Sequence, residues 1–233
     1  MGIDYKNYHR DDDYNKMEST FKNIFKKRFK LISKFIKNPK RVLDIGCSNG
    51  VFLDLYHNSE TWGVEPSNIG YRIKDVRHRI IHEYFEDAKI PENYFDLVIM
   101  NHTLEHVKDA DLVLAKIYEL LRKNRILFID VPNAGGLGSK IMGDNWAYRL
   151  ANEHNYQFTK VSLSKKLKDS GFKIIHWESR SGIFELANPL QDLWLSLINF
   201  KMRFVTNIVL FPYSIVTTLL NMGDSMSIIC KKS

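Results

Sequence analysis

The stretch VLDIGCSNG, residues 42–50, decides how the rest of the chain is interpreted. It begins as a short apolar run and reaches Gly46, which predicts a buried strand followed by a tight turn. Small residues after a strand let a ligand approach the backbone closely, and the helix that follows presents free N–H groups. Because Asp44 would repel a phosphate here, the turn suits a neutral or cationic ligand better.

A second strand, predicted over residues 61–65, ends in the carboxylate of Glu65, fifteen residues beyond Gly50. A carboxylate at this point of a doubly wound sheet accepts hydrogen bonds from the hydroxyls of a ribose. The two strand ends together therefore predict a nucleoside-binding site, and the other end of the nucleoside need not be a pyrophosphate.

Strands and helices alternate along the rest of the chain. Short, nearly continuous apolar runs predict strands that are covered on both faces, and apolar residues spaced by three and four predict helices. The predicted fold is therefore α/β, a doubly wound and mostly parallel sheet with helices on both faces, in a single domain over residues 1–233. The remaining strands are expected at 79–84, 94–101, 125–131, 172–178 and 225–231, and the helices at 17–37, 51–56, 67–77, 109–122 and 162–170.

Five motifs occur in a fixed order, and together they resemble the class I S-adenosylmethionine-dependent methyltransferases of small-molecule type. The resemblance covers roughly residues 40–180 and resumes at the final strand. It implies seven strands in the order 3-2-1-4-5-7-6, with only the last strand antiparallel, and S-adenosyl-L-methionine as the cofactor. The motifs are VLDIGCSNG (42–50), WGVEPS (62–67), FDLVIMNHTLEHV (95–107), LLRKNRILFIDVPN (120–133) and HNYQFTKVSLSKKLKDSGF (154–172).

The sequence departs from the family pattern at two turns. Ser48 stands where a glycine is usual, which narrows the first turn but leaves Gly46 and Gly50 in place. Asn124 replaces one of the paired glycines before the fifth strand, and asparagine tolerates a left-handed conformation. Neither change is expected to undermine cofactor binding.

The resemblance assigns cofactor contacts position by position. It implies that Asp44, Gly46, Cys47 and Gly50 surround the methionine part and the ribose. It implies that Glu65 holds the ribose hydroxyls and that Pro66 and Ser67 line the adenine. Either Glu86 or Asp87, after the third strand, would lie near the adenine amine, and Asn101 follows the fourth strand, where the methyl group is presented.

Two histidines are the candidates for the catalytic base, because an oxygen acceptor must lose its proton as it is methylated. His102 follows the fourth strand, and His154 is expected in the acceptor pocket; the alternative for His102 is a solvated loop histidine. The sequence leaves oxygen, nitrogen and carbon acceptors open. No metal is expected at Glu105, His106 and the other histidines.

Charge and cysteine content limit the location and the partners. The chain of 233 residues has a net charge of +7, and residues 16–41 hold ten basic residues and one acid. Such a segment attracts phosphates, although a solvated helix face gives the same pattern. Two cysteines and a polar N-terminus without a signal sequence indicate a cytoplasmic protein.

Two segments are expected to shape the acceptor site: the arm and basic helix over 1–38, and an apolar helical cap over 183–223. Residues 204–223 are uncharged over a length that could span a bilayer, but the strand expected after them would return the chain to the sheet. An apolar pocket with a cationic rim predicts a small-molecule acceptor that is lipid-linked or bears a phosphate, peripheral contact with an anionic membrane, and no nucleic acid. The alternative is that both segments simply pack on the sheet.

Two other functions remain open from the sequence. One is a non-catalytic protein that binds a nucleotide cofactor or docks on a membrane. The other is an NAD-linked oxidoreductase, which is disfavoured because the turn has three residues between Gly46 and Gly50 rather than the pattern G-x-G-x-x-G.

Overall fold

The computed structural model describes residues 18–67, 77–189, 194 and 208–233. Most of the helix expected at 67–77, and the middle of the cap expected at 183–223, lie outside the described residues.

Seven strands form one sheet in the order β3-β2-β1-β4-β5-β7-β6. Only β7 runs antiparallel to its neighbours β5 and β6, so the predicted topology is confirmed. The strands are β1 (Arg41–Ile45), β2 (Glu60–Val64), β3 (His78–Ile81), β4 (Phe95–Asn101), β5 (Leu121–Pro132), β6 (Phe172–Arg180) and β7 (Ser225–Lys232).

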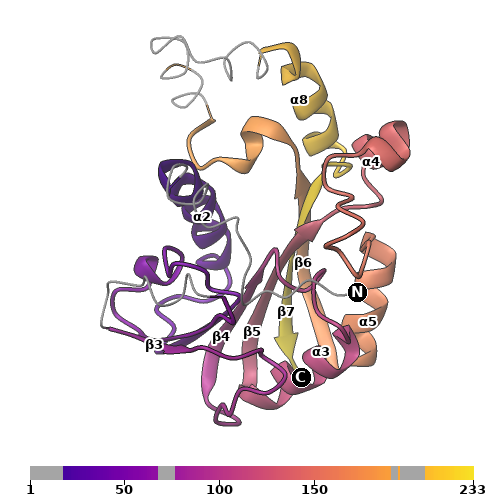
Figure 1. Cartoon of the computed structure of the whole chain (residues 1–233). Helices are drawn as coiled ribbons and strands as arrows, with labels where there is room; N and C mark the ends of the chain where they lie inside the picture. Colours follow the sequence, from indigo (N-terminus) through magenta and orange to yellow (C-terminus); the bar gives the residue numbers. More distant parts are fainter. Residues whose placement is uncertain (1–17, 68–76, 190–193, 195–207) are drawn as a thin grey trace.

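Helices cover both faces of the sheet (Figure 1). Helix α2 (Glu18–Ile32) packs on one face, and α3 (Ala110–Leu120) and α5 (Lys160–Asp169) pack on the other. Strand β5 shows the alternation that a sheet buried on both faces requires: Ile126 and Phe128 belong to the core under α2, whereas Leu127 and Ile129 belong to the core under α3 and α5. Successive residues of one strand therefore reach opposite layers.

Helix ends and turns follow the expected local chemistry. Asp109 caps α3 by accepting hydrogen bonds from the main-chain N–H groups of Asp111 and Leu112. Asn124 adopts a φ of 64°, the left-handed conformation anticipated for this turn. Ser48 adopts a φ of 48°, so a serine takes the backbone conformation that a glycine usually supplies.

The segment at 51–56 differs from the prediction, because it contains only a short 3-10 turn, η2 (Leu53–Leu55), instead of a helix. Val51, Phe52 and Leu53 are all buried, so consecutive side chains enter the core. A helix would present them in different directions and leave part of this run facing solvent. Helix α2 is also shorter than expected, because it ends at Ile32 and turns follow before Pro39.

The apolar segment before the last strand leaves and re-enters the sheet at the same place, since Arg180 at the end of β6 pairs with Ser225 at the start of β7. Between them lie η5 (Gly182–Glu185) and α8 (Phe211–Leu219), which projects beyond the carboxyl end of β6 (Figure 1). Among the described residues, none of the helices combines the length and the apolar character needed to cross a membrane.

Candidate active site

The parallel strands bring the predicted functional residues to one edge of the sheet. Asp44 in β1 lies beside Gly63 in β2 and Ile99 in β4, so the carboxyl ends of three strands meet here. In an open α/β sheet this edge is where ligands bind, next to the strand at which the order reverses.

A pocket opens directly above this edge. Four of the residues predicted to contact the cofactor line it, together with Ser48 and two aromatic residues that the sequence did not single out, Phe25 and Phe52. The lining residues are Phe25, Asp44, Gly46, Cys47, Ser48, Phe52 and Asn101. Phe25 belongs to the apolar face of α2, and the spacing that predicts such a face does not say which site it covers.

The Asp44 carboxylate is buried without a compensating partner among the described residues. Its side chain is 3% exposed, and it receives no hydrogen bond from the described part of the chain. Burial, and secondarily the charge of Glu65, raise the pKa of Asp44 well above its usual range. A buried carboxylate in this state favours a cationic partner, which would restore its charge. Asn101 adds a buried side-chain oxygen without a hydrogen-bond partner among the described residues.

Glu65 is fixed between the two turns that follow β1 and β2. One oxygen accepts a hydrogen bond from the Ser48 N–H at 2.9 Å, and the other accepts one from the Ser67 N–H at 2.9 Å. Each carboxylate oxygen can accept more than one hydrogen bond, so Glu65 keeps capacity for two neighbouring hydroxyls.

Close packing explains the small residues of the first turn. Gly46 has a φ of 75°, and a Cβ there would lie 2.4 Å from Oγ1 of Thr103. A Cβ on Gly63 would lie 2.5 Å from Sγ of Cys47. Burial raises the pKa of the Cys47 thiol well above its usual range, so this cysteine acts as a small packing residue and not as a nucleophile. Gly50 also has a positive φ, 78°.

The predicted adenine contacts are brought together only in part. Ser67 is buried beside Glu65, and Pro66 is half-buried between them, next to the undescribed residues 68–76. Glu86 and Asp87 are both exposed and lie outside the pocket lining. Their loop is held instead from α3, where Nζ of Lys116 donates to the main-chain oxygens of residues 85, 86 and 88.

His102 lies between two carboxylates, just beyond the pocket residue Asn101. Its Nδ1 is 3.3 Å from Oε1 of Glu105, and its Nε2 is 3.4 Å from Oδ1 of Asp130. Burial alone would lower the pKa of His102, but the two carboxylates outweigh it and raise the pKa above its ordinary value. The His102 side chain is 34% exposed, so it is a partly solvated loop histidine that lies between two carboxylates.

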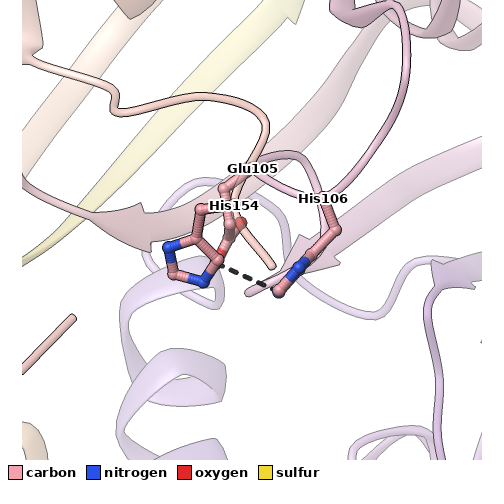
Figure 2. A group of neighbouring side chains, drawn as sticks. All are labelled: Glu105, His106 and His154. Carbon is pink, nitrogen blue, oxygen red and sulfur yellow. Dashed lines mark ion pairs between the residues drawn. The ribbon is translucent and has the colours of Figure 1, made fainter. Parts of the chain in front are cut away.

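His154 lies beside Glu105 and His106, and the three side chains form one group (Figure 2). One potential ligand atom from each of the three residues lies within 4.8 Å of the others, so the group could hold a metal ion. His106 Nε2 is 3.9 Å from Glu105, and its Nδ1 is 3.0 Å from the Glu153 main-chain oxygen. The two Glu105 oxygens and Nδ1 of His154 are buried without a hydrogen-bond partner among the described residues. Burial lowers the pKa of His154.

The sequence analysis missed a buried ionic network beside His102. Asp130 in β5 is 0% exposed and forms ion pairs with Arg28 of α2 and Arg180 of β6. The RILFIDV run marks Asp130 only as the acid of a buried strand, and nothing in the sequence shows that two distant arginines converge on it.

Comparisons with known proteins support one family. A family model described as a methyltransferase domain matches residues 17–177. A ubiquinone biosynthesis O-methyltransferase of Mesorhizobium japonicum is 27% identical over 190 residues, which are 72% of this chain and 74% of that protein. A protein of the same name from Agrobacterium fabrum is 26% identical with the same coverage of both chains, 72% and 74%.

Solved structures share the fold. A S-adenosylmethionine-dependent methyltransferase of Archaeoglobus fulgidus aligns with a TM-score of 0.65 at 21% identity, over 94% of this chain and 99% of that chain. A phosphoethanolamine N-methyltransferase of Haemonchus contortus, solved with S-adenosyl-L-methionine, aligns with a TM-score of 0.67 at 18% identity, over 99% of this chain and 60% of that chain.

Proposed function

The chain belongs to the methyltransferase-domain family and is a S-adenosylmethionine-dependent methyltransferase, and from this premise we propose that it methylates a hydroxyl oxygen of a small molecule. The identification sets aside the non-catalytic and NAD-linked alternatives. The observation that carries the proposal is that His102, which directly follows the pocket residue Asn101, lies 3.3 Å from Glu105, and that Glu105 neighbours His154. The names of the relatives, O-methyltransferases, support the same acceptor atom.

The pocket residues fit the cofactor by their chemistry. The uncompensated carboxylate of Asp44 suits the positively charged methionine end, and Glu65 has the remaining acceptor capacity that a ribose requires. Gly46 and Cys47 would offer backbone groups, Ser67 and Pro66 would flank the base, and Asn101 would lie near the methyl group. When bound, S-adenosyl-L-methionine supplies a methyl group that its sulfonium already activates for in-line displacement.

The protein's own tasks are then alignment, exclusion of water and removal of one proton. The acceptor hydroxyl would lose its proton to a ring nitrogen of neutral His102 as it is methylated. Glu105 and His154 would hold the acceptor through buried atoms that have no hydrogen-bond partner among the described residues. His154, the second candidate base, has its pKa lowered by burial and so stays neutral as a hydrogen-bond acceptor.

We further propose that the acceptor has an apolar portion and that the enzyme touches an anionic membrane surface. Support comes from α8 and its flanking residues, where Val209 is 69%, Leu219 76% and Leu220 63% exposed. Ile141 of α4 (Leu137–Met142) is 71% exposed. Exposed apolar side chains of this size mark surfaces that bind apolar partners. We also propose that the acceptor bears a phosphate, because helix α2 is basic. We propose no nucleic acid as a partner, because α8 of the cap has no basic residue.

The test is transfer of labelled methyl groups from S-adenosyl-L-methionine to matched probes. A catechol such as 3,4-dihydroxybenzoate offers hydroxyl oxygens. The matching diamine, 3,4-diaminobenzoate, offers nitrogens at the same two ring positions. Label in the methoxy product and none in the methylamine supports the proposal. Label only in the amine product would exclude an oxygen acceptor, and the family assignment would stand unchanged.

A further inference from the structure

We propose that Asp130 is a positioning residue that orients His102 for proton removal, and that Arg28 and Arg180 hold Asp130 in place. The inference rests on the proposed role of His102 as the base. It concerns residues that neither the family resemblance nor the sequence motifs single out.

The backbone already connects the two residues. In the register of β4 and β5, Asn101 lies opposite Asp130, and the N–H of His102 donates to the main-chain oxygen of Asp130 at 2.8 Å. His102 has a φ of 53°, a conformation that L-residues adopt rarely and that redirects the chain at the end of β4. This turn directs the ring back over the end of β5, where its Nε2 lies 3.4 Å from Oδ1 of the same Asp130.

Two serines and two arginines hold the Asp130 carboxylate. Oδ1 accepts a hydrogen bond from Ser225 at 2.8 Å, and Oδ2 accepts one from Arg180 at 2.9 Å and another from Ser227. Nε of Arg28 lies 3.2 Å from Oδ2. Despite burial, which would raise it, the pKa of Asp130 is held well below its usual range by Arg28, Arg180 and, to a smaller extent, His102. The carboxylate therefore stays charged throughout the working pH range.

A carboxylate faces each nitrogen of the His102 ring: Asp130 lies 3.4 Å from Nε2, and Glu105 lies 3.3 Å from Nδ1. In the proposed arrangement Asp130, which two arginines hold, keeps the hydrogen of neutral His102 on Nε2. Nδ1 then carries the lone pair. Nδ1 faces Glu105, whose oxygens, like Nδ1 of His154, have no hydrogen-bond partner among the described residues. The acceptor hydroxyl would enter here. A carboxylate that fixes the tautomer of a catalytic histidine and stabilises its charged form is the arrangement of hydrolytic triads.

Four charged or titratable groups act on His102, and together they would set its titration midpoint. Glu105 and Asp130 favour the protonated ring, and Arg28 from α2 opposes it. His154 interacts with His102 across Glu105. Removal of the Asp130 charge shifts this balance in one direction, towards easier loss of the proton.

The experiment uses the full chain with 15N-labelled histidine, and NMR reads the tautomer and the titration midpoint of His102 directly. His102→Asn identifies the signal, because asparagine tolerates the left-handed conformation at this position. We expect the Nε2–H tautomer in the neutral wild-type ring and a midpoint above the ordinary histidine value. In Asp130→Asn the midpoint falls below that of the wild type, and the single tautomer becomes a mixture.

Asp96→Asn is the matched control. Asp96 is also a buried aspartate held by two arginines, Arg122 at 3.1 Å and Arg125 at 3.0 Å, but it lies near the start of β4, at the other end of the sheet. The His102 signal should stay at the wild-type midpoint in Asp96→Asn. If Asp130→Asn does not fold, Ser225→Ala removes a competing hydrogen bond from the Oδ1 that faces His102 and leaves the charge of Asp130 in place, so a small rise in the His102 midpoint is expected. An unchanged midpoint in this variant would count against the inference.

Kinetics give the second readout. With a hydroxyl probe that the wild type methylates, Asp130→Asn should lower kcat by roughly 100- to 10,000-fold, the range of general base catalysis, and leave the KM for S-adenosyl-L-methionine within twofold. A wild-type Nδ1–H tautomer, or the same midpoint in Asp130→Asn as in wild type, would overturn the inference. Failure of the proposed oxygen acceptor would appear differently, as amine methylation by a protein whose His102 still responds to Asp130.

Discussion

Phe25 of α2 stacks on Phe52, which follows the first turn, with ring centroids 4.8 Å apart and planes inclined by 10°. Both rings line the pocket that contains Asp44. A helix that precedes the whole sheet in sequence thus forms a wall of the pocket that we propose binds the cofactor. Three residues further along the same helix, Arg28 reaches Asp130. Helix α2 therefore contributes to both the cofactor side and the acceptor side of the site.

Truncation of Phe25 tests this wall. Phe25→Ala should destabilise the protein by about 3–5 kcal/mol and weaken cofactor binding, because it removes a buried ring from the pocket. Phe29→Ala is the control, since Phe29 lies one turn later on α2 and packs against Tyr56 at 5.1 Å, outside the pocket lining. Chemical denaturation and calorimetric titration measure the two effects. Equal cofactor affinity in both variants would show that α2 does not shape the site.

Removal of the Glu65 carboxylate should weaken S-adenosyl-L-methionine by about 1.5–3 kcal/mol, the usual range for hydrogen bonds to a charged group. Asp44→Ala should cost at least as much. Glu60→Ala, at the opposite end of β2 and bonded to Tyr94 and Trp62, is expected to bind the cofactor as the wild type does. The site is misassigned if Glu65→Ala and Asp44→Ala both fold and retain wild-type affinity by calorimetry.

The pH dependence of stability should report Asp44. Because folding raises the pKa of this acid, its contribution to stability is full below the ordinary carboxyl pKa and is lost as the pH rises through the raised value. Asp44→Asn removes this loss, so the Tm of the variant should gain on that of the wild type with rising pH. Thermal unfolding without cofactor, from acid to neutral pH, measures the difference. Parallel profiles would show that Asp44 titrates normally.

Chelation tests the expectation that no metal is needed. Glu105 lies 3.3 Å from His102 and 3.9 Å from His106, and the proposed removal of a proton by His102 requires no metal ion there. We expect activity to survive dialysis against EDTA. Activity that disappears on dialysis and returns with a divalent ion would place a metal at Glu105, His106 and His154; loss of that rescue in His154→Ala would confirm the ligand.

Membrane contact predicts sedimentation with anionic vesicles at low salt, weaker sedimentation at high salt, and little with neutral vesicles. Leu219→Ser on α8 should reduce binding, because Leu219 is 76% exposed. Val161→Ser on α5 is the control, a residue of 79% exposure on another helix. Absence of sedimentation with anionic vesicles at low salt would remove the membrane from the proposal and favour a freely dissolved acceptor.

The sequence alone determined the fold and named the residues proposed for the cofactor side of the site, because both follow from local patterns. Apolar runs covered on both faces specify parallel strands, and the turn at 42–50 places Asp44 and Gly46 at a strand end whatever packs around them. The left-handed turn at Asn124 and the cap at Asp109 followed from single residues for the same reason.

Tertiary structure alone decided how the acceptor side is built. The bond from Arg28 to Asp130 joins residues 102 positions apart, and the bond from Ser225 to Asp130 joins residues 95 positions apart. No local pattern encodes such pairs, because they depend on which strand lies next to which and on which face of the sheet α2 covers. The short turn at 51–56 and the exposed positions of Glu86 and Asp87 have the same origin, since burial depends on neighbours that are distant in the chain.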